Sequence, residues 1–265
     1  MTIAMTRRAL LAAGMATAAS PIRIAKGEGA TVTPTTEGLS PTEKMQRVLK
    51  AWELSKELNY EYPIPAAPPE KLVEAERALG YRLPESMRTL YLTHDGSEYL
   101  GGNIGYWPLF PNERTELAIT TGTQQLREWD WPLPPDVLVF GDDGSDSTHC
   151  LWIEEGSDRE PIVVETVDAG EMFALAGDDL ASFLVGRSAF YLLMYASDGF
   201  DLTAALNALE VPNELRGIDL DDELYHDVWR WANPNLPDMD PNSYDRWWTP
   251  DKVREYVANR ERRNP

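Results

Sequence analysis

The chain has 265 residues, of which 43% are hydrophobic and 10% aromatic, enough to build a hydrophobic core and to exclude wholesale disorder. Its 44 acidic and 24 basic residues give a formal net charge of −20, which argues against nucleic-acid binding because phosphate neutralisation needs a basic face. The single cysteine, Cys150, excludes an intramolecular disulfide and a cysteine-rich zinc site. An acidic protein is instead suited to a basic protein partner, because complementary charge speeds their encounter.

The first 25 residues have the three parts of an export signal. Arg7 and Arg8 precede a small apolar stretch, Ala9 to Ala19, which ends in small residues that suit cleavage. The two arginines make the segment similar to a twin-arginine signal. We therefore expect residues 1–25 to direct export; the alternative is a cytoplasmic protein whose N-terminus is not a functional signal. Residues 26–40 lack apolar periodicity and are expected to form a flexible linker.

A leading helix is predicted within residues 41–62. Ser40 and Glu43 have the spacing of a capping box, and Pro41 suits the first helical position. Apolar residues then recur at helical spacing as far as about Leu58. The resulting helix is amphipathic and must dock on another part of the protein.

Two short helices are predicted at the start of the central region, residues 63–196, after a proline-rich break. The first runs from Glu70 to Leu79 with Gly80 as its stop, and the second runs from Pro84 to Thr93. Strands are expected to follow them.

The predicted strands are apolar or aromatic runs that end at turn residues. A long apolar helix should close the region, capped by Asp178 and Asp179 and extending to about Tyr195. Residues 121–130 are expected to form a short helix or an irregular insert. The predicted strands are Ile104 to Phe110, Val137 to Phe140, Thr148 to Ile153 and Pro161 to Val167.

The last segment, residues 197–265, is acidic and rich in tryptophan. Helices are predicted near Asp219–Trp231 and from Pro250 to about Arg262. The tryptophans of this tail are expected to anchor it on the main domain rather than to contact a partner. Taken together, the elements predict an α+β fold: a mostly antiparallel sheet flanked by N-terminal and C-terminal helices, with an added helical, tryptophan-rich tail.

No pattern in the chain predicts catalysis. Cys150 and His149 are neighbours on a predicted strand, where successive side chains face opposite sides of the sheet, so they cannot act as a nucleophile–base pair. Nothing in the sequence brings the other histidines, His94 and His226, to Cys150. The chain also lacks the glycine–serine elbow of hydrolases and the glycine-rich phosphate loops. We therefore expect no enzyme and no cofactor.

The acidic turn from Asp142 to Asp146 is expected to connect two strands. Its Gly144 stands third, whereas an EF-hand loop needs glycine at the sixth position and glutamate at the twelfth, which is Ile153 here. A weak divalent site at this turn stays open, but no metal centre is predicted. The chain has no run of eighteen apolar residues, so no membrane-spanning segment is expected once the signal is removed.

Five features that occur in a fixed order over about residues 66–190 resemble the SUKH superfamily, which contains fungal cell-wall assembly regulators and bacterial immunity proteins against toxins. Ser145 departs from the resemblance, because glycine is common at that position. The five features are Glu76-x-x-Leu79-Gly80-x-x-Leu83-Pro84, Tyr91 to Gly96, the strand and turn Val137 to Asp146, the strands Cys150 to Ile153 and Pro161 to Val163, and the helix Leu180 to Leu184.

The residues that carry the resemblance shape the backbone, since glycine permits turns and proline begins helices. None of them is a catalytic group, which suits a family of binding modules. The structural motif residues are Glu76, Gly80, Leu83, Pro84, Gly96, Gly141 and Gly144.

The resemblance implies a non-catalytic protein-binding module, and we favour an immunity-type protein that neutralises a toxin by binding it. The alternative is an exported or regulatory scaffold related to the cell-wall assembly regulators, with no toxin partner. In either case the expected partner is a protein, for the immunity reading a basic toxin. The partner surface is expected on the sheet face and loops that carry the aromatic residues Tyr106, Trp107, Trp129, Trp131, His149 and Trp152.

Overall fold

The computed structural model describes nine parts of the chain. The predicted export signal, residues 1–25, and most of the predicted linker lie outside these parts. The described residues are 38–58, 65–100, 103–142, 147–154, 157, 159–167, 171–218, 222–237 and 246–263.

The leading helix α1 (Pro41–Leu54) has the predicted capping box. The Glu43 backbone N–H donates to the Ser40 hydroxyl at 3.3 Å, and the Ser40 backbone N–H donates to the Glu43 carboxylate at 2.8 Å. The α-helix ends earlier than predicted and is followed by a short 3₁₀ turn, η1 (Lys56–Leu58). At the boundary, the Ser55 hydroxyl donates to the Ala51 carbonyl, a local bond that competes with the helical ladder.

The central region begins with two helices and a hairpin. The helices α2 (Pro69–Leu79) and α3 (Glu85–Tyr91) lie where they were predicted. The strands β1 (Ser97–Tyr99) and β2 (Ile104–Tyr106) pair antiparallel. The predicted strand from residue 104 to 110 therefore ends at Tyr106, two residues before Pro108, which has no backbone N–H for a ladder.

The main sheet has four strands in the order β3-β4-β5-β6, and every neighbouring pair is antiparallel. A short helix, α4 (Gly122–Glu128), precedes it. The strand β6 was not predicted, because its residues are apolar without alternation and continue into the apolar helix that follows. The strands are β3 (Val137–Asp142), β4 (Thr148–Trp152), β5 (Ile162–Val167) and β6 (Met172–Gly177).

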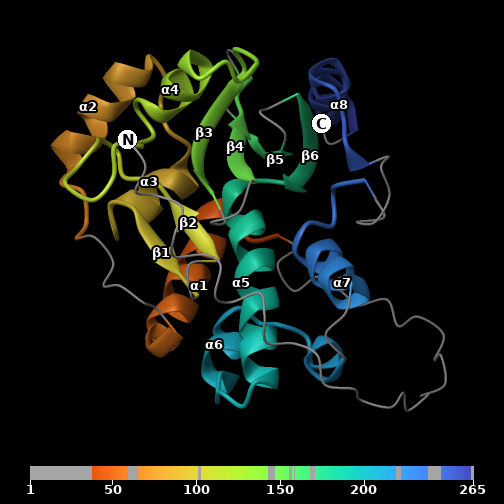
Figure 1. Ribbon diagram of the computed structural model, residues 1–265. Helices are drawn as coiled ribbons and strands as arrows, with labels where there is room; N and C mark the ends of the chain where they lie inside the picture. The colour runs from red at the N-terminus through yellow and green to blue at the C-terminus, as the bar shows by residue number, and fades with distance from the viewer. Residues whose placement is uncertain are drawn as a thin grey trace. The chain divides into compact units, whose positions relative to one another are not determined.

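Helix α5 (Leu180–Ser197) lies at the centre of the described fold, between α1 and α7 (Figure 1). It begins as predicted: the Asp179 carboxylate accepts the Ser182 backbone N–H at 2.7 Å. By length and composition α5 could cross a membrane, but 61% of its apolar window is buried in the protein. Its low polarity is therefore explained by packing on several neighbours at once.

The described part of the tail contains four helical segments. The predicted helices α7 and α8 are present, whereas α6 and η3 were not predicted. In Figure 1 α8 lies beside β6, and the backbones of Trp248 and Phe173 exchange two hydrogen bonds of 2.7 and 2.9 Å there. The tail thus pairs with the last strand of the sheet. Its segments are α6 (Thr203–Ala208), η3 (Asn213–Gly217), α7 (Asp222–Ala232) and α8 (Pro250–Arg263).

The helices and antiparallel sheets confirm the predicted α+β class. Both faces of the main sheet are covered, so the fold has two hydrophobic cores. One face packs on α5 and the helices around it, and its core includes Phe140 and Phe183. The other face packs on α4 and α8, and its core includes Cys150 and Val253. Aromatic residues on either face of the sheet are therefore buried.

Candidate functional site

The six residues predicted for the partner surface do not share a surface. Tyr106, Trp107, His149 and Trp152 are at most 7% exposed. The helices cover the main sheet that carries His149 and Trp152, and Tyr106 and Trp107 pack into the two cores. Trp131 is half-buried and packs against the core that includes Cys150. Trp129 is 62% exposed, the largest exposed fraction among the large hydrophobic residues that the structure describes.

The glycines of the motif that the structure describes lie at a helix end, at a turn and where two backbones approach closely. Gly80 ends α2 with φ of +68°, and Gly96 has φ of +89°. An added Cβ at Gly96 would lie 2.6 Å from the Pro108 nitrogen, and one at Gly141 would lie 2.1 Å from the Gly105 carbonyl oxygen. These positions require glycine for conformation or for close approach of two backbones. Gly144 lies outside the described residues.

Glu76, Leu83 and Pro84 join α2 to α3. The Leu83 backbone N–H donates to the Glu76 carboxylate at 3.1 Å, and Arg88 of α3 forms an ion pair with the same carboxylate. Leu83 is buried, and Pro84 precedes the first residue of α3. Glu76 thus holds the helix junction together.

The exposed Trp129 lies in a tight turn after α4, residues 128–132, which we call the Trp129 turn. The Trp129 backbone N–H donates to the Gln125 carbonyl at 3.0 Å, and the Trp131 backbone N–H donates to the Leu126 carbonyl at 3.1 Å. Between them Asp130 has φ of +63°, a left-handed conformation that aspartate tolerates better than most residues. The turn therefore has a defined backbone conformation.

Arg127 binds the backbone that follows this turn. Its guanidinium donates to the carbonyls of Leu133 and Pro134, at 3.2 and 2.5 Å. Glu128 and Asp130, on either side of Trp129, are exposed. The turn thus presents one large aromatic ring between two carboxylates on a constrained backbone.

A second polar group lies under α5 and was missed by sequence reasoning. Glu165 on β5 pairs with Arg187 on α5, and the His149 Nε2 lies 3.4 Å from the same carboxylate and 3.2 Å from the guanidinium. The ring of Phe183 contacts both the imidazole and the guanidinium, at 4.9 Å from the His149 ring centre and 5.7 Å from the guanidinium carbon. Glu165 and Arg187 are the lone charged residues of apolar segments, a signal that could have identified them.

The electrostatics of this group follow from its burial. Burial alone would raise the pKa of the Glu165 carboxyl, but the charge of Arg187 and the hydrogen bond and charge of His149 outweigh it and lower that pKa to about 2. Glu165 is therefore ionised over the ordinary pH range. The group is a structural ion pair that joins β5 to α5.

A small cavity borders Glu165 on its other side. It lies between β6 and α7, has a volume of about 40 Å³, and is partly open to solvent. We call it the α7 pocket. It is lined by Glu165, Ala174, Leu175, Ala176, Tyr225, His226, Trp229 and Arg246.

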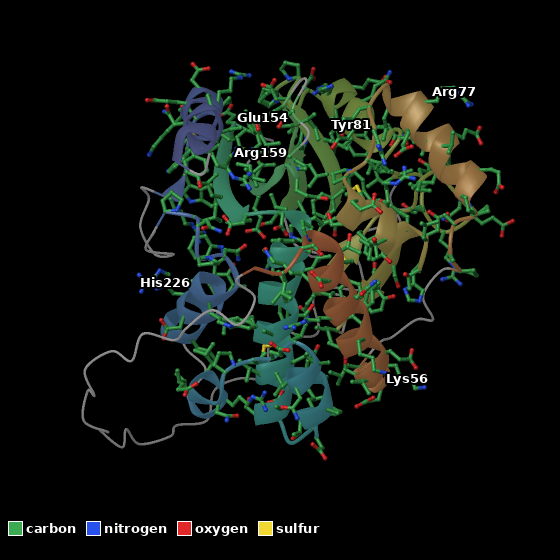
Figure 2. The ribbon with its side chains drawn as sticks, turned by 180° about the vertical axis from the view of Figure 1, so that it is seen from behind. Lys56, Arg77, Tyr81, Glu154, Arg159 and His226 are labelled. Carbon is green, nitrogen blue, oxygen red and sulfur yellow. The ribbon has the colours of Figure 1, made fainter. Side chains whose placement is uncertain are left out.

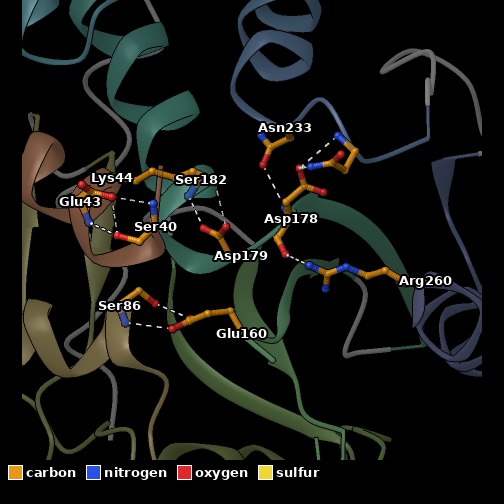
Figure 3. A network of polar contacts seen from close by, with 11 residues as sticks. Ser40, Glu43, Lys44, Ser86, Glu160, Asp178, Asp179, Ser182, Asn233 and Arg260 are labelled. Atoms are coloured by element: carbon orange, nitrogen blue, oxygen red, sulfur yellow. Dashed lines mark hydrogen bonds and ion pairs between the residues drawn. The ribbon is translucent and has the colours of Figure 1, made fainter. Parts of the chain in front are cut away.

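Polar contacts join the start of α5 to α1, to the end of α7 and to α8, and a separate pair of hydrogen bonds joins Ser86 to Glu160, as Figure 3 shows. The Asp179 carboxylate caps α5 and also forms an ion pair with the Lys44 ammonium of α1 at 3.2 Å. Before β5, the Glu160 carboxylate accepts the backbone N–H and hydroxyl of Ser86 at 3.1 and 2.7 Å. Burial raises the pKa of Glu160 despite these hydrogen bonds.

Asp178, the residue before Asp179, contacts the tail. Its backbone N–H donates to the Asn233 side chain at 3.0 Å, and its backbone carbonyl accepts Arg260 of α8 at 2.8 Å. Burial raises the pKa of the Asp178 carboxyl, although hydrogen bonds from Asn235 and the charge of Arg260 lower it in part. These contacts hold the tail against the start of α5.

The residues tested for catalysis lie apart. Cys150 is buried, and burial raises the pKa of its thiol to about 12, so the reactive thiolate does not form at neutral pH. Cys150 and His149 lie in the two different cores, as strand geometry predicted. His94 contacts the Tyr99 hydroxyl at 2.6 Å, and His226 lines the α7 pocket.

Within the described residues, no three His, Cys, Asp or Glu side chains are grouped so that they could hold a metal ion. Of the turn from Asp142 to Asp146, residues 143–146 lie outside the description. The Asp142 carboxylate accepts the Trp107 indole N–H at 3.0 Å. That contact gives the first residue of the turn a structural role.

Comparison with known proteins identifies the central region. Residues 66–185 match the SMI1 / KNR4 family (SUKH-1). No curated protein matches the chain. The match spans α2 to the first residues of α5 and contains the hairpin, the main sheet and the Trp129 turn. The match confirms the resemblance of this central region to the SUKH superfamily.

Proposed function

We propose that this protein is a non-catalytic binding module of the immunity type, which neutralises a basic toxin by covering its surface with the Trp129 turn. The observation that carries the proposal is the 62% exposure of Trp129 on a constrained turn. Tryptophan is enriched among the residues that dominate binding energy at protein interfaces. A constrained turn also loses less conformational entropy when it binds.

Charge supports a basic partner. Glu128 and Asp130 flank the exposed ring, and the whole chain has a net charge of −20. Complementary charge raises association rates and disfavours wrong partners. The Trp129 ring would fill an apolar depression on the toxin, with basic residues of the toxin around it.

The second candidate is an exported or regulatory scaffold without a toxin partner, as in the cell-wall assembly regulators. The feature that favours it is the N-terminal segment with Arg7 and Arg8, which is similar to a twin-arginine signal. A protein carried out of the cytoplasm could not protect against a toxin that acts there. A toxin that acts in or outside the cell envelope is compatible with both export and immunity.

The test begins with the genes beside this one. Where a neighbouring gene encodes a large secreted toxin, that toxin is expressed in cells with and without this protein. We expect the full chain to restore growth and Trp129→Ala to lose most of the protection, because truncation of a central interface tryptophan weakens binding by about 30-fold or more.

The matched control is Phe200→Ala, since Phe200 is also an exposed aromatic residue, 46% exposed, but follows α5. This variant should protect as well as the unchanged chain. Equal protection by the Trp129 variant would contradict the proposed surface. The absence of a toxin gene nearby would favour the scaffold. A neighbouring gene whose expression does not change growth, with or without this protein, would favour it as well.

The electrostatic part is tested separately by kinetics. The rate of association between the purified protein and the toxin should fall by about tenfold or more from low to high salt. A rate that does not change with salt would contradict the charge argument while leaving the aromatic contact to be judged by the growth assay.

A further inference from the structure

We infer that the α7 pocket is a binding site for a carboxylate group, with Arg246 as its charge partner. This site is separate from the Trp129 turn and does not depend on the proposed function. The pocket has a volume of about 40 Å³, which holds a group of a few heavy atoms. It is too small for a nucleotide and large enough for a carboxylate.

Arg246 is the feature that points to an anion. In a chain with 44 acidic residues, the Arg246 guanidinium forms no ion pair with any described residue, and its contact is with the Trp247 ring, 4.8 Å from the ring centre. It lines the pocket together with the carboxylate of Glu165, but that carboxylate is already paired with Arg187. An arginine that lines a cavity and pairs with no carboxylate of the described residues is suited to bidentate binding of one.

Tyr225 adds a neutral hydrogen-bond donor. Burial raises the pKa of its hydroxyl to about 12, although the nearby charges of Arg187 and Arg246 lower it in part. The phenol therefore keeps its proton and can donate to an anion. Tyr225 and Arg246 both line the α7 pocket.

The charges around the pocket favour one negative charge over two. Arg187, which lines the adjoining cavity beside Ala176 and Tyr225, and Arg246 together carry two positive charges, and Glu165 carries one negative charge. Among these three described residues the remaining charge is +1, which balances a carboxylate. A phosphate dianion would meet the Glu165 carboxylate with an uncompensated charge.

The walls are formed by small and aromatic side chains. Ala174 and Ala176 leave space on the β6 side, and the Trp229 indole N–H donates to the Ala176 carbonyl at 3.2 Å, which fixes α7 against the strand. The rings of Tyr225 and Trp229 would contact the apolar part of the ligand. The ligand is therefore either a small organic acid or the end of a peptide, which share the carboxylate.

The test follows the indole N–H resonance of Trp229 by NMR in the full chain, while sodium acetate is added at constant ionic strength. We expect a saturable shift. Arg246→Gln should weaken acetate binding by about tenfold or more, because it removes a charge-assisted hydrogen bond. Tyr225→Phe, which keeps the ring, should weaken it about threefold to tenfold.

Arg77→Gln is the matched control. Arg77 is an exposed arginine on α2, and Figure 2 shows it on the opposite side of the view from His226. This variant should bind acetate like the unchanged chain. Where Arg246→Gln does not keep the native indole spectrum, Tyr225→Phe decides the result.

Two further ligands complete the experiment. Phosphate at pH 8 should bind more weakly than acetate, and a short peptide with a free C-terminus is compared with its amidated form. Tighter binding of the free peptide than of acetate assigns the site to a peptide end, and equal binding assigns it to a small acid. A linear shift with acetate, an equal response in the Arg246 variant, or tighter binding of phosphate would overturn the carboxylate site.

Discussion

The carboxylate of Asp178 accepts two hydrogen bonds from Asn235, one from the backbone N–H and one from the side-chain amide, both at 3.2 Å. Asp178 lies within the region between β6 and α5, whereas Asn235 follows α7 in the tail. Because Asp178 also holds Asn233 and Arg260, this one residue connects the sheet to two separate parts of the tail. The tail is thus packed into the domain that it follows.

Loss of this connection should destabilise the whole protein. Asn235→Ala removes the side-chain donor and leaves a buried carboxylate with fewer partners, so we expect the free energy of unfolding to fall by about 1–3 kcal/mol. Chemical denaturation measures the change. Gln124→Ala removes an exposed hydrogen bond to Glu128 and should change stability by less than about 0.5 kcal/mol. Equal effects of the two variants would show that the Asp178 connection adds nothing.

The close approach of β2 to β3 should make Gly141 intolerant of any side chain. Gly141→Ala places a Cβ 2.1 Å from the Gly105 carbonyl oxygen, so one of the two backbones must move. We expect a loss of at least about 2 kcal/mol in the free energy of unfolding, from denaturant midpoints. Gly217→Ala, where a Cβ meets nothing within 4 Å, is the control and should cost less than about 1 kcal/mol. A stable Gly141→Ala protein would mean that the strand pair adjusts freely.

The buried ion pair between Glu165 and Arg187 should respond much more strongly to mutation than an exposed one. Glu165→Ala leaves a buried guanidinium without its carboxylate, and we expect a loss of about 3–5 kcal/mol. Asp136→Ala breaks the pair of Asp136 with Arg254, in which the two side chains are 33% and 42% exposed, and should cost about 1 kcal/mol or less. Denaturation of both variants gives the comparison. Similar losses would contradict the importance of burial.

Stability should pass through a maximum in the acidic range, because buried carboxyls are shifted in opposite directions. Burial raises the pKa of Glu160 and of Asp178, so their contribution is complete below the unfolded-state pKa and is lost as the pH rises through the folded-state pKa. The pKa of Glu165 is lowered to about 2, so its contribution is present above about pH 4.5 and is lost as the pH falls toward 2.

Single variants separate the two limbs of this profile. Glu160→Gln should reduce the loss of stability at pH values above the unfolded-state pKa. Glu165→Gln should reduce the loss of stability at pH values below it. Denaturation midpoints measured from pH 2.5 to 8 test both. A profile that keeps both slopes in both variants would show that other groups control the pH dependence.

Local spacing in the sequence was sufficient to predict the helices whose ends are fixed by residues a few positions apart. The capping box of Ser40 and Glu43, the cap at Asp179 and the stop at Gly80 involve residues a few positions apart, so their hydrogen bonds can be predicted from spacing. The alternation along β4 likewise placed His149 and Cys150 on opposite faces. The α+β class followed from the order of these elements.

Tertiary structure alone decided which aromatic residues are exposed and which charges meet. Trp152 and Trp129 were both predicted to lie on the partner surface. Helix α8 covers Trp152, whereas the turn after α4 leaves Trp129 exposed. The contact of Glu165 with Arg187 joins residues 22 positions apart on two elements. Burial depends on segments that are distant in the chain, and local periodicity carries no information about which of them will pack together.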